Sequence, residues 1–499
     1  MVGAGGPLMN WHLGIQVGRE TVVKGPGATV WICVASFLAA CSAPAPEIEK
    51  KPAFELHPDL EMNLFAAEPD VIDPVALTFD EAGRMYVVEM RDYPLGAPDG
   101  QPRSTIRLLE DTDGDGRADR SIVFAEGLSF PTSIAPWRGG VFVTAPPQLI
   151  YLKDSDGDGR ADVREVVFEG VRLGVTDSNL NGLRWGLDNR IHGVNGGNGG
   201  RLRSTLSGAE VDLGRRDFSF DPRTGELVTT FHTSGGFGLV FDPWGRSFST
   251  YNIDHLQQRI LEGRYLDRAR GLPPMKATEN ISVHGAMARI FPISVPETRV
   301  NHPEQAGYYS AAGGMGYLDW GRPGLPGGIL ICDVVGNLVS REELSEAGPI
   351  FRAERAPSER AREFLASRDN AFRPVGVEMG PDGALYVIDM QRAVIEHPDY
   401  IPAKVLRRLD LSEGSDRGRI YRVAPRRQAP GFGASLAEAS PQRLVEALSS
   451  PLRWRRETAQ RLLVERGEGP LEELAVLLVS GASPLGRLTL SPQIVNPFP

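Results

Sequence analysis

One short unit recurs six times along this sequence: an apolar strand, a tight turn rich in aspartate and glycine, and a second apolar strand. Each copy has the alternation and turn chemistry of an antiparallel hairpin. A single hairpin cannot bury both faces, whereas hairpins arranged radially pack on their neighbours and leave few open edges. The copies cover residues 75–88, 133–143, 183–193, 239–249, 315–332 and 375–388. They predict an all-β chain folded as a six-bladed β-propeller over residues 52–425.

Further apolar segments follow the hairpins and complete each blade. Residues 106–109 and 121–124 are predicted as the third and fourth strands of one blade, and residues 148–152 and 165–168 as those of the next. We expect residues 419–423 to form the third strand of the last blade. Residues 61–66, from the other end of the propeller, are expected to supply its fourth strand and so close the ring.

The composition narrows the function classes. The formal net charge is −10 and no basic stripe is present, which argues against a nucleic-acid partner. Of the three cysteines only Cys332 lies in the predicted propeller, so no disulfide framework is available. The chain has no CxxCH haem motif, no GxGxxG fingerprint after a strand and no phosphate-binding loop of the Walker type.

The N-terminus is predicted to direct export. Residues 28–40 are an apolar run preceded by Arg19 and Lys24, as in a signal peptide, and residues 38–41 (Leu-Ala-Ala-Cys) resemble a bacterial lipobox. We therefore expect a signal peptide over 1–41, lipidation of Cys41, a tether over 42–51, and a lipid-anchored protein facing the periplasm or cell surface. The alternative is a buried helix that ends in an unmodified cysteine.

Within each hairpin the residues before the first strand and after the second share one face of the disc, here called the mouth, and the Asp/Gly turns lie on the opposite face, here called the turn face. The mouth is predicted to be rich in asparagine, arginine and aspartate, which suits an oxygen-rich ligand such as a sugar or a quinone. The predicted mouth residues are Glu89, Arg91, Asn181, Asn195, His232, Asn252, His255, Asp333, Asn337, Arg373, Asp389 and Arg392.

Two acidic loops have the spacing of calcium-binding loops. Carboxylates at loop positions 1, 3, 5 and 9, with glycine at position 6 and a backbone carbonyl at position 7, form an oxygen cage for a hard divalent cation. Glu165 stands at position 12 of the second loop, whereas the first loop has Ile122 there. The alternative is a plain acidic turn. The predicted calcium ligands are Asp111, Asp113, Asp115, Arg117 and Asp119, and then Asp154, Asp156, Asp158, Arg160, Asp162 and Glu165.

Several stretches, taken together, resemble the predicted membrane-bound dehydrogenases of planctomycetes and their relatives. These stretches are residues 183–193, 221–227, 363–367, 372–375, 389–398 and 416–422. Members of that group are similar to soluble quinoprotein glucose dehydrogenases, so the resemblance implies a propeller that binds pyrroloquinoline quinone (PQQ) and oxidises a sugar or another alcohol. Such chains often continue into HEAT-type helices and a cytochrome c domain.

The C-terminal part departs from that pattern. Residues 440–480 are predicted to hold one partial HEAT-like helical repeat, because apolar residues recur there at helical spacing. No cytochrome domain follows, and residues 481–499 are predicted to be an irregular tail. An external electron acceptor, such as a separate cytochrome c, would therefore be required.

The resemblance also implies functional residues. The glucose dehydrogenases carry a histidine base just before the first strand of a blade, whereas residues 177–182 contain no histidine here. His192 on the following strand is the substitute, although a structural role beside Trp185 is an equal alternative. His232 and His255 on the mouth face are the other candidates for the base, against a plain role as loop histidines. Arg373 and Arg392 are predicted to pair with quinone carboxylates, with Asp389 as a further catalytic residue. The equal alternative is a bridge from these arginines to Asp389 or Glu396 that holds the last blade. The predicted cofactor-binding residues are Asn181, Asn195, Asn252 and His255.

Three hypotheses follow for the function. The first is an exported quinone-dependent dehydrogenase of a sugar or another alcohol, with a small-molecule or glycan substrate. The second is a non-catalytic cell-surface propeller that binds polysaccharide or protein, since fold alone cannot decide function. The third is a hydrolase that uses a metal ion at the mouth.

Overall fold

The computed structural model describes residues 53–467, apart from residues 98, 233–234, 270, 272–275, 296–306, 310–311, 322–323 and 429–434. The predicted signal peptide, Cys41 and the tether lie outside the described residues, as do residues 468–480 of the predicted helical repeat and the tail.

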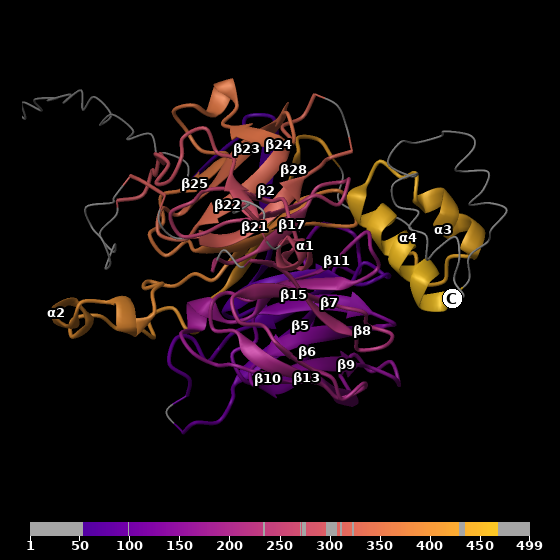
Figure 1. Cartoon of the computed structure of the whole chain (residues 1–499). Helices are drawn as coiled ribbons and strands as arrows, with labels where there is room; N and C mark the ends of the chain where they lie inside the picture. Colours follow the sequence, from indigo (N-terminus) through magenta and orange to yellow (C-terminus); the bar gives the residue numbers. More distant parts are fainter. Residues whose placement is uncertain are drawn as a thin grey trace, which may run out of the picture. The chain divides into compact units, whose positions relative to one another are not determined.

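Six antiparallel sheets make up the described part of the chain, which confirms the predicted six-bladed β-propeller (Figure 1). Blade 1 consists of β3 (Pro74–Phe79), β4 (Met85–Glu89), β5 (Ser104–Glu110) and β6 (Arg120–Leu128). Blade 2 consists of β7 (Ser133–Trp137), β8 (Gly140–Ala145), β9 (Gln148–Lys153) and β10 (Val163–Val171), extended by β13 (Gly200–Ser204) and β14 (Glu210–Asp212). Blade 3 consists of β11 (Asn181–Trp185), β12 (Ile191–Val194), β15 (Arg216–Phe220) and β16 (Leu227–His232).

The remaining three blades differ in regularity. Blade 4 consists of four three-residue strands, β17 (Leu239–Phe241), β18 (Ser247–Ser249), β19 (Gln257–Arg259) and β20 (Thr278–Asn280). Blade 5 consists of β21 (Ala312–Leu318), β22 (Gly328–Asp333), β23 (Leu338–Ala347) and β25 (Leu365–Ser367), with β24 (Ile350–Glu354) and β1 (Phe54–Leu56) added at its edge. Blade 6 consists of β26 (Pro374–Met379), β27 (Leu385–Asp389), β28 (Arg419–Pro425) and β2 (Leu60–Ala67).

The six first strands form a closed ring. Each contacts the next in the order β3, β7, β11, β17, β21, β26 and back to β3. Strand β2, from the N-terminal end of the propeller, pairs antiparallel with β28, with Leu60 opposite Pro425 and Ala67 opposite Arg419, and Figure 1 shows the two side by side. The predicted closure of the last blade by the opposite end of the propeller is therefore confirmed.

The Asp/Gly turns recur with the same hydrogen bonds. In blade 1 the Asp80 carboxylate accepts from the backbone N–H groups of Ala82 and Arg84, both at 2.9 Å. Asp242 in blade 4 likewise accepts from its second and fourth following residues, both at 2.9 Å. Gly83 has φ +87°, a left-handed conformation that glycine adopts without a steric cost.

Apolar side chains fill the interfaces between neighbouring blades. The Phe79 ring of blade 1 lies 5.1 Å from the Tyr386 ring of blade 6, and Trp137 of blade 2 stacks on Trp185 of blade 3 at 5.5 Å. Middle strands such as β4 are buried along their whole length because a blade packs on each face. The core is therefore divided among the blade interfaces, as the radial arrangement requires.

Four α-helices accompany the sheets in the described residues: α1 (Gly263–Arg268), α2 (Ala403–Leu406), α3 (Pro441–Ala447) and α4 (Arg453–Arg466). The last two form where helices were predicted and pack on each other, as Figure 1 shows. Ser440 caps α3 by accepting from the Arg443 N–H, and Gly467 ends α4 with φ +64°. None of the helices in the described ranges is both long and apolar enough to cross a bilayer.

The helix α4 lies on the turn face of the propeller. Arg461 forms an ion pair with Glu81 at 3.0 Å, and Glu81 belongs to the first turn of blade 1. Gln460 donates to Asn189 in the turn of blade 3 at 2.8 Å, and Arg453 donates to the Phe241 carbonyl of blade 4 at 2.7 Å. The helix therefore spans the turns of several blades and covers that end of the central channel.

Candidate functional site

The central channel is narrow and partly filled. It encloses a cavity of about 150 Å³, lined by the six first strands and closed at the turn face by α4 through Trp454 and Thr458. Arg184 on β11 and Glu378 on β26 form an ion pair across the channel at 2.7 Å, from strands three places apart in the ring. The ion pair and α4 therefore limit the space for a ligand inside the channel.

Arg373, Asp389 and Arg392 all lie at the mouth end of blade 6, and each is buried. The Arg373 guanidinium donates to three backbone carbonyls, those of Val334, Arg392 and Ala393, at 2.9, 2.8 and 2.5 Å. Asp389 accepts from the Arg373 backbone N–H at 2.8 Å. These contacts hold the mouth loops of blades 5 and 6, in line with the structural alternative.

Arg392 connects blade 6 to blade 1. Its guanidinium binds both carboxylate oxygens of Asp73, at 2.6 and 2.9 Å, and both side chains are fully buried. Asp73 immediately precedes β3, so this pair fixes the entry to blade 1. A bidentate pair of this kind is strong and geometrically specific, and it occupies the donors predicted to face a quinone.

The predicted cofactor-binding residues are spread over blades 3 and 4. Asn181 donates to the carbonyls of Asn179 and Gly236 and accepts from the Gly238 N–H. Asn195 bonds in a similar way to the carbonyls of Gly214 and Arg216, which fixes the β12–β13 connection. Asn252 is exposed beside the mouth.

His192 lies on the side of blade 3 that faces the turns. Its Nε2 is 3.0 Å from the carboxylate of Asp188, which is in the β11–β12 turn, and its ring packs edge-on against Phe241 at 5.2 Å. The structure therefore separates His192 from Arg373, Asp389 and Arg392 at the mouth. A pairing of His192 with the turn accounts for its presence without a role in catalysis.

A carboxyl group stands at the mouth where the resemblance places a base. Asp177 belongs to the short 3-10 turn Thr176–Ser178 just before β11. Burial raises the pKa of Asp177 to about 7, the nearby charge of Glu396 adds to the rise, and the backbone N–H of His397 opposes it. Tyr400, half exposed, lies close enough to Asp177 and Glu396 for their charges to interact. Asp177, Glu396 and Tyr400 are here called the mouth cluster.

Both predicted calcium loops have converging carboxylates. In each loop the first three aspartates bring oxygen atoms within 4.8 Å of one another. The aspartate at position 9 accepts instead from the hydroxyl at position 2: Asp119 from Thr112 at 2.6 Å, and Asp162 from Ser155. Glu165 is exposed on β10 and lies outside the converging group. The clustered groups are Asp111, Asp113 and Asp115 in the first loop, and Asp154, Asp156 and Asp158 in the second.

Each calcium loop also connects its blade to the preceding one. The loops join the third and fourth strands of blades 1 and 2, as predicted. At position 8 of the first loop the Ala118 N–H donates to the Phe65 carbonyl of blade 6 at 2.8 Å. The equivalent Ala161 N–H of the second loop donates to the Phe124 carbonyl of blade 1 at 2.7 Å. A cation in these loops would therefore stabilise blade interfaces.

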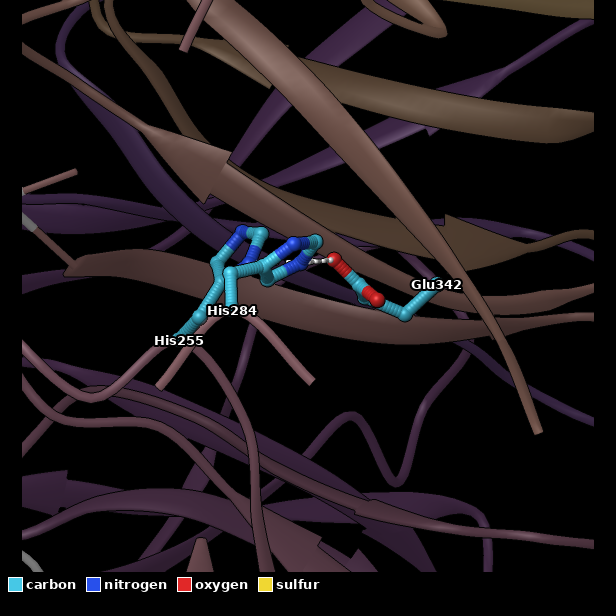
Figure 2. Close-up of side chains that lie close together, drawn as sticks. All are labelled: His255, His284 and Glu342. Atoms are coloured by element: carbon cyan, nitrogen blue, oxygen red, sulfur yellow. Dashed lines mark hydrogen bonds and ion pairs between the residues drawn. The ribbon is translucent and has the colours of Figure 1, made fainter. Parts of the chain in front are cut away.

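The structure also assembles a cluster that the sequence did not reveal. His255 follows β18, His284 follows β20, and Glu342 lies within β23 of blade 5 (Figure 2). His255 Nδ1 and His284 Nε2 lie 3.1 and 2.7 Å from the same oxygen, Oε1 of Glu342. Burial alone would raise the pKa of Glu342, but the two histidines that face the carboxylate outweigh burial and lower the pKa to about 2. These three residues are here called the His–Glu cluster.

The hydrogen bonds and ion pairs of the predicted residues decide whether those residues can bind PQQ. The side chains predicted to bind it donate to, or pair with, other groups of the propeller, and only Asn252 among them is exposed. A quinone with several carboxylates requires available cationic or amide donors. The predicted residues therefore do not fit PQQ in this arrangement, whereas the aspartates of the two loops fit calcium.

Comparison with solved structures finds similar propellers at low identity. An oxidoreductase of the glucose dehydrogenase type from Thermus thermophilus is 17% identical, with 73% of this chain and all of that chain covered and a TM-score of 0.43. A PQQ-bound aldose sugar dehydrogenase from Streptomyces coelicolor is 15% identical, with 74% and 100% covered and a TM-score of 0.40. A calcium-containing carbohydrate-active enzyme of family AA12 from Trichoderma reesei is 14% identical, with 75% and 98% covered and a TM-score of 0.41.

No curated protein matches this sequence. A protein family does match it, over residues 47–427, which include every strand of the propeller. The chain belongs to the family described as domain of unknown function DUF7133.

Proposed function

We propose that this chain is an oxidoreductase that dehydrogenates a sugar or another alcohol at the mouth of the propeller, with Asp177 as the general base. The observation that carries the proposal is the position and pKa of Asp177. Its carboxyl lies just before the first strand of blade 3, where the resemblance places the base, and its pKa is raised to about 7. A base is most effective when its pKa lies near the working pH.

The mouth cluster supplies the groups that this chemistry requires. Oxidation of an alcohol transfers the hydroxyl proton to a base and a hydride to an acceptor. Glu396 disfavours a second negative charge beside it, so Asp177 gains a proton readily when the substrate hydroxyl releases one. The half-exposed ring of Tyr400 offers an apolar face beside these carboxyls, and the exposed ring of Tyr251 lies near Tyr400, which suits a polyhydroxyl ligand.

The acceptor of the hydride is a separate part of the proposal. The resemblance implies PQQ, but the side chains predicted for it are engaged within the propeller, so no step is assigned to the quinone. Electrons would leave to an external acceptor such as a separate cytochrome c. We further propose that the protein is exported and lipid-anchored through Cys41, on the basis of the apolar run and the lipobox at residues 28–41.

The test is a dye-reduction assay on the purified chain with calcium, with and without added PQQ, over a panel of sugars and alcohols. We expect one substrate class to reduce the dye, with kcat/KM rising as the pH passes through about 7, because Asp177 must be ionised to accept a proton. D177N should lower kcat at least a hundredfold, since a positioned base contributes a factor of about 10²–10⁴. D188N, which alters the His192 pair on the opposite side, should leave kcat unchanged.

Folding of the variant can be checked independently. Because burial disfavours the charged form of Asp177, D177N should unfold at the same or a higher temperature than the native chain at pH 8. Retention of full activity by D177N would contradict the proposed base, and absence of turnover with every substrate and acceptor would contradict the oxidoreductase.

A non-catalytic glycan-binding propeller is the second candidate. Two observations favour it. The guanidinium groups of Arg373 and Arg392 are bonded within the propeller, and the rings of Tyr251 and Tyr400 are exposed at the mouth. Binding of an oligosaccharide that Y400A abolishes, without any dye reduction, would establish this function in place of the first.

A further inference from the structure

We propose that the His–Glu cluster is a binding site for a divalent transition metal ion, of which Zn²⁺ is the representative case, and that the ion locks blade 4 to blade 5. This site is distinct from the mouth cluster and from the two calcium loops. It does not depend on the oxidoreductase proposal.

The first argument is the convergence of three ligand atoms. His255 Nδ1, His284 Nε2 and a carboxylate oxygen of Glu342 all lie within 4.8 Å of one another. Figure 2 shows both imidazole rings directed at the same carboxylate. Zinc takes imidazole nitrogen and carboxylate oxygen at about 2.0–2.2 Å in tetrahedral geometry, which places neighbouring ligand atoms a little over 3 Å apart. The observed spacings of 3.1 and 2.7 Å need only a small expansion to admit an ion.

The second argument is the tautomer of His255. Its Nε2 lies 2.7 Å from the Ser340 hydroxyl, which itself donates to the Ile331 carbonyl at 3.3 Å. A hydroxyl has one proton, so Ser340 accepts from an Nε2–H of His255, and the Nδ1 of a neutral ring is left with a lone pair. A bare nitrogen directed at a carboxylate is repulsive unless a cation lies between them.

The third argument is a pair of buried polar atoms. Among the described residues, His255 Nδ1 and Glu342 Oε2 have no hydrogen-bond partner. Both side chains are fully buried, where a polar atom without a partner is destabilising. An ion bound between the two histidines and the carboxylate would coordinate the first atom and lie beside the second. The contact with Ser340 then orients a metal-binding imidazole, as outer hydrogen bonds commonly do.

The chemistry of the ligands selects the metal. Two imidazoles and one carboxylate suit zinc and its neighbours in the first transition row, whereas calcium takes oxygen ligands alone. About a quarter of the His284 side chain (23%) is exposed, so a water molecule can reach the fourth position. The ion would connect the loops after β18 and β20 of blade 4 to the third strand of blade 5. It would thus stabilise the blade with the shortest strands.

The test uses the full purified chain, stripped of metals with a chelator and then held in excess calcium so that the acidic loops are occupied. Titration with Zn²⁺ in a calorimeter should show one tight site, and Co²⁺ should give the visible absorption of a tetrahedral site. Zn²⁺ should also raise the melting temperature. H284A should lose the tight site and the Co²⁺ spectrum, whereas H232A, which removes an exposed histidine of blade 3, should retain both.

E342Q provides a second variant in case H284A folds poorly, because it keeps the shape of the side chain and removes its charge. We expect E342Q to weaken Zn²⁺ binding at least tenfold. The proposal is overturned if the native chain in excess calcium binds no Zn²⁺, or if H284A and E342Q bind it as tightly as the native chain. In either case the three residues form a hydrogen-bonded group only.

Discussion

Neighbouring blades are joined in different ways on the two sides of the ring. Around blades 6, 1 and 2 the connections are local and repeated: each calcium loop donates a backbone N–H to the outer strand of the preceding blade. Around blades 4 and 5 the strands of blade 4 have three residues each. The loop after β20 exchanges backbone hydrogen bonds with Ala353 of β24, and two loop histidines, His255 and His284, converge on Glu342 of β23. The comparison shows that loop backbone joins blades on both sides of the ring, and that the irregular blade adds a buried group of converging side chains.

The largest expected effect tests the junction of blades 6 and 1. R392A should lower the free energy of unfolding by about 3–5 kcal/mol, because it leaves the buried carboxylate of Asp73 without its partner. Urea denaturation followed by tryptophan fluorescence would measure it. The exposed pair of Arg103 and Asp99 provides the control, and R103A should be indistinguishable from the native chain. A small effect of R392A would show that this junction does not depend on the buried pair.

Calcium removal should have the next largest effect, and it should act on the regular side of the ring. At a calcium concentration a hundredfold above the dissociation constant, one site contributes about 2.7 kcal/mol. D111N and D154N should each lose a similar part of the calcium-dependent rise in melting temperature, because the two loops have the same geometry. The double variant should no longer respond to a calcium chelator, and D416N, at an exposed aspartate, should respond normally.

On the irregular side, S340A should weaken Zn²⁺ binding roughly tenfold, because it removes the hydroxyl that orients His255. The readout is the same calorimetric titration in excess calcium. V339A, at the neighbouring buried position of β23, is a matched control that lowers stability but leaves the zinc affinity unchanged. Equal zinc affinity in S340A and the native chain would remove the tautomer argument.

The smallest expected effect concerns Glu165. The structure places it on β10, exposed and apart from the three converging aspartates, so E165Q should leave calcium affinity unchanged within twofold. The predicted role at position 12 of the loop would instead require a loss of tenfold or more. Calcium titration of E165Q beside D154N decides whether Glu165 is a calcium ligand. It also shows whether the two loops are equivalent.

The sequence predicts those parts of the fold that repeat or are local. The six hairpins, the pairing of residues 61–66 with residues 419–423 and the position of the calcium loops all follow from alternation, turn residues and spacing. The short helices at the C-terminus follow from helical periodicity. No local pattern shows that α4 covers the turn face, because its contacts with Glu81 and Asn189 join segments far apart in the chain.

The functional sites divide in the same way, into those formed by residues close in sequence and those formed by residues far apart. The loop aspartates lie within nine residues of one another, so their spacing was visible. Glu342 lies in mid-strand, 87 residues after His255, and no spacing rule connects them. Asp177 lies in a stretch without the histidine that the resemblance implies, and only its burial beside Glu396 marks its carboxyl as a candidate base. The positions of Arg373 and Arg392 at the mouth were predictable, but their partners were not.

The pairing of β2 with β28 also determines when the propeller can finish folding during synthesis. The ring cannot close until the chain has been made from Leu60 to Pro425, so the last blade is completed only near the end of synthesis. Until then β2 is an unpaired strand, and the edge of the growing disc is open to association with other chains. Contacts between such distant segments also slow folding. We therefore expect folding of this protein to be most vulnerable to aggregation just before the two ends of the propeller meet.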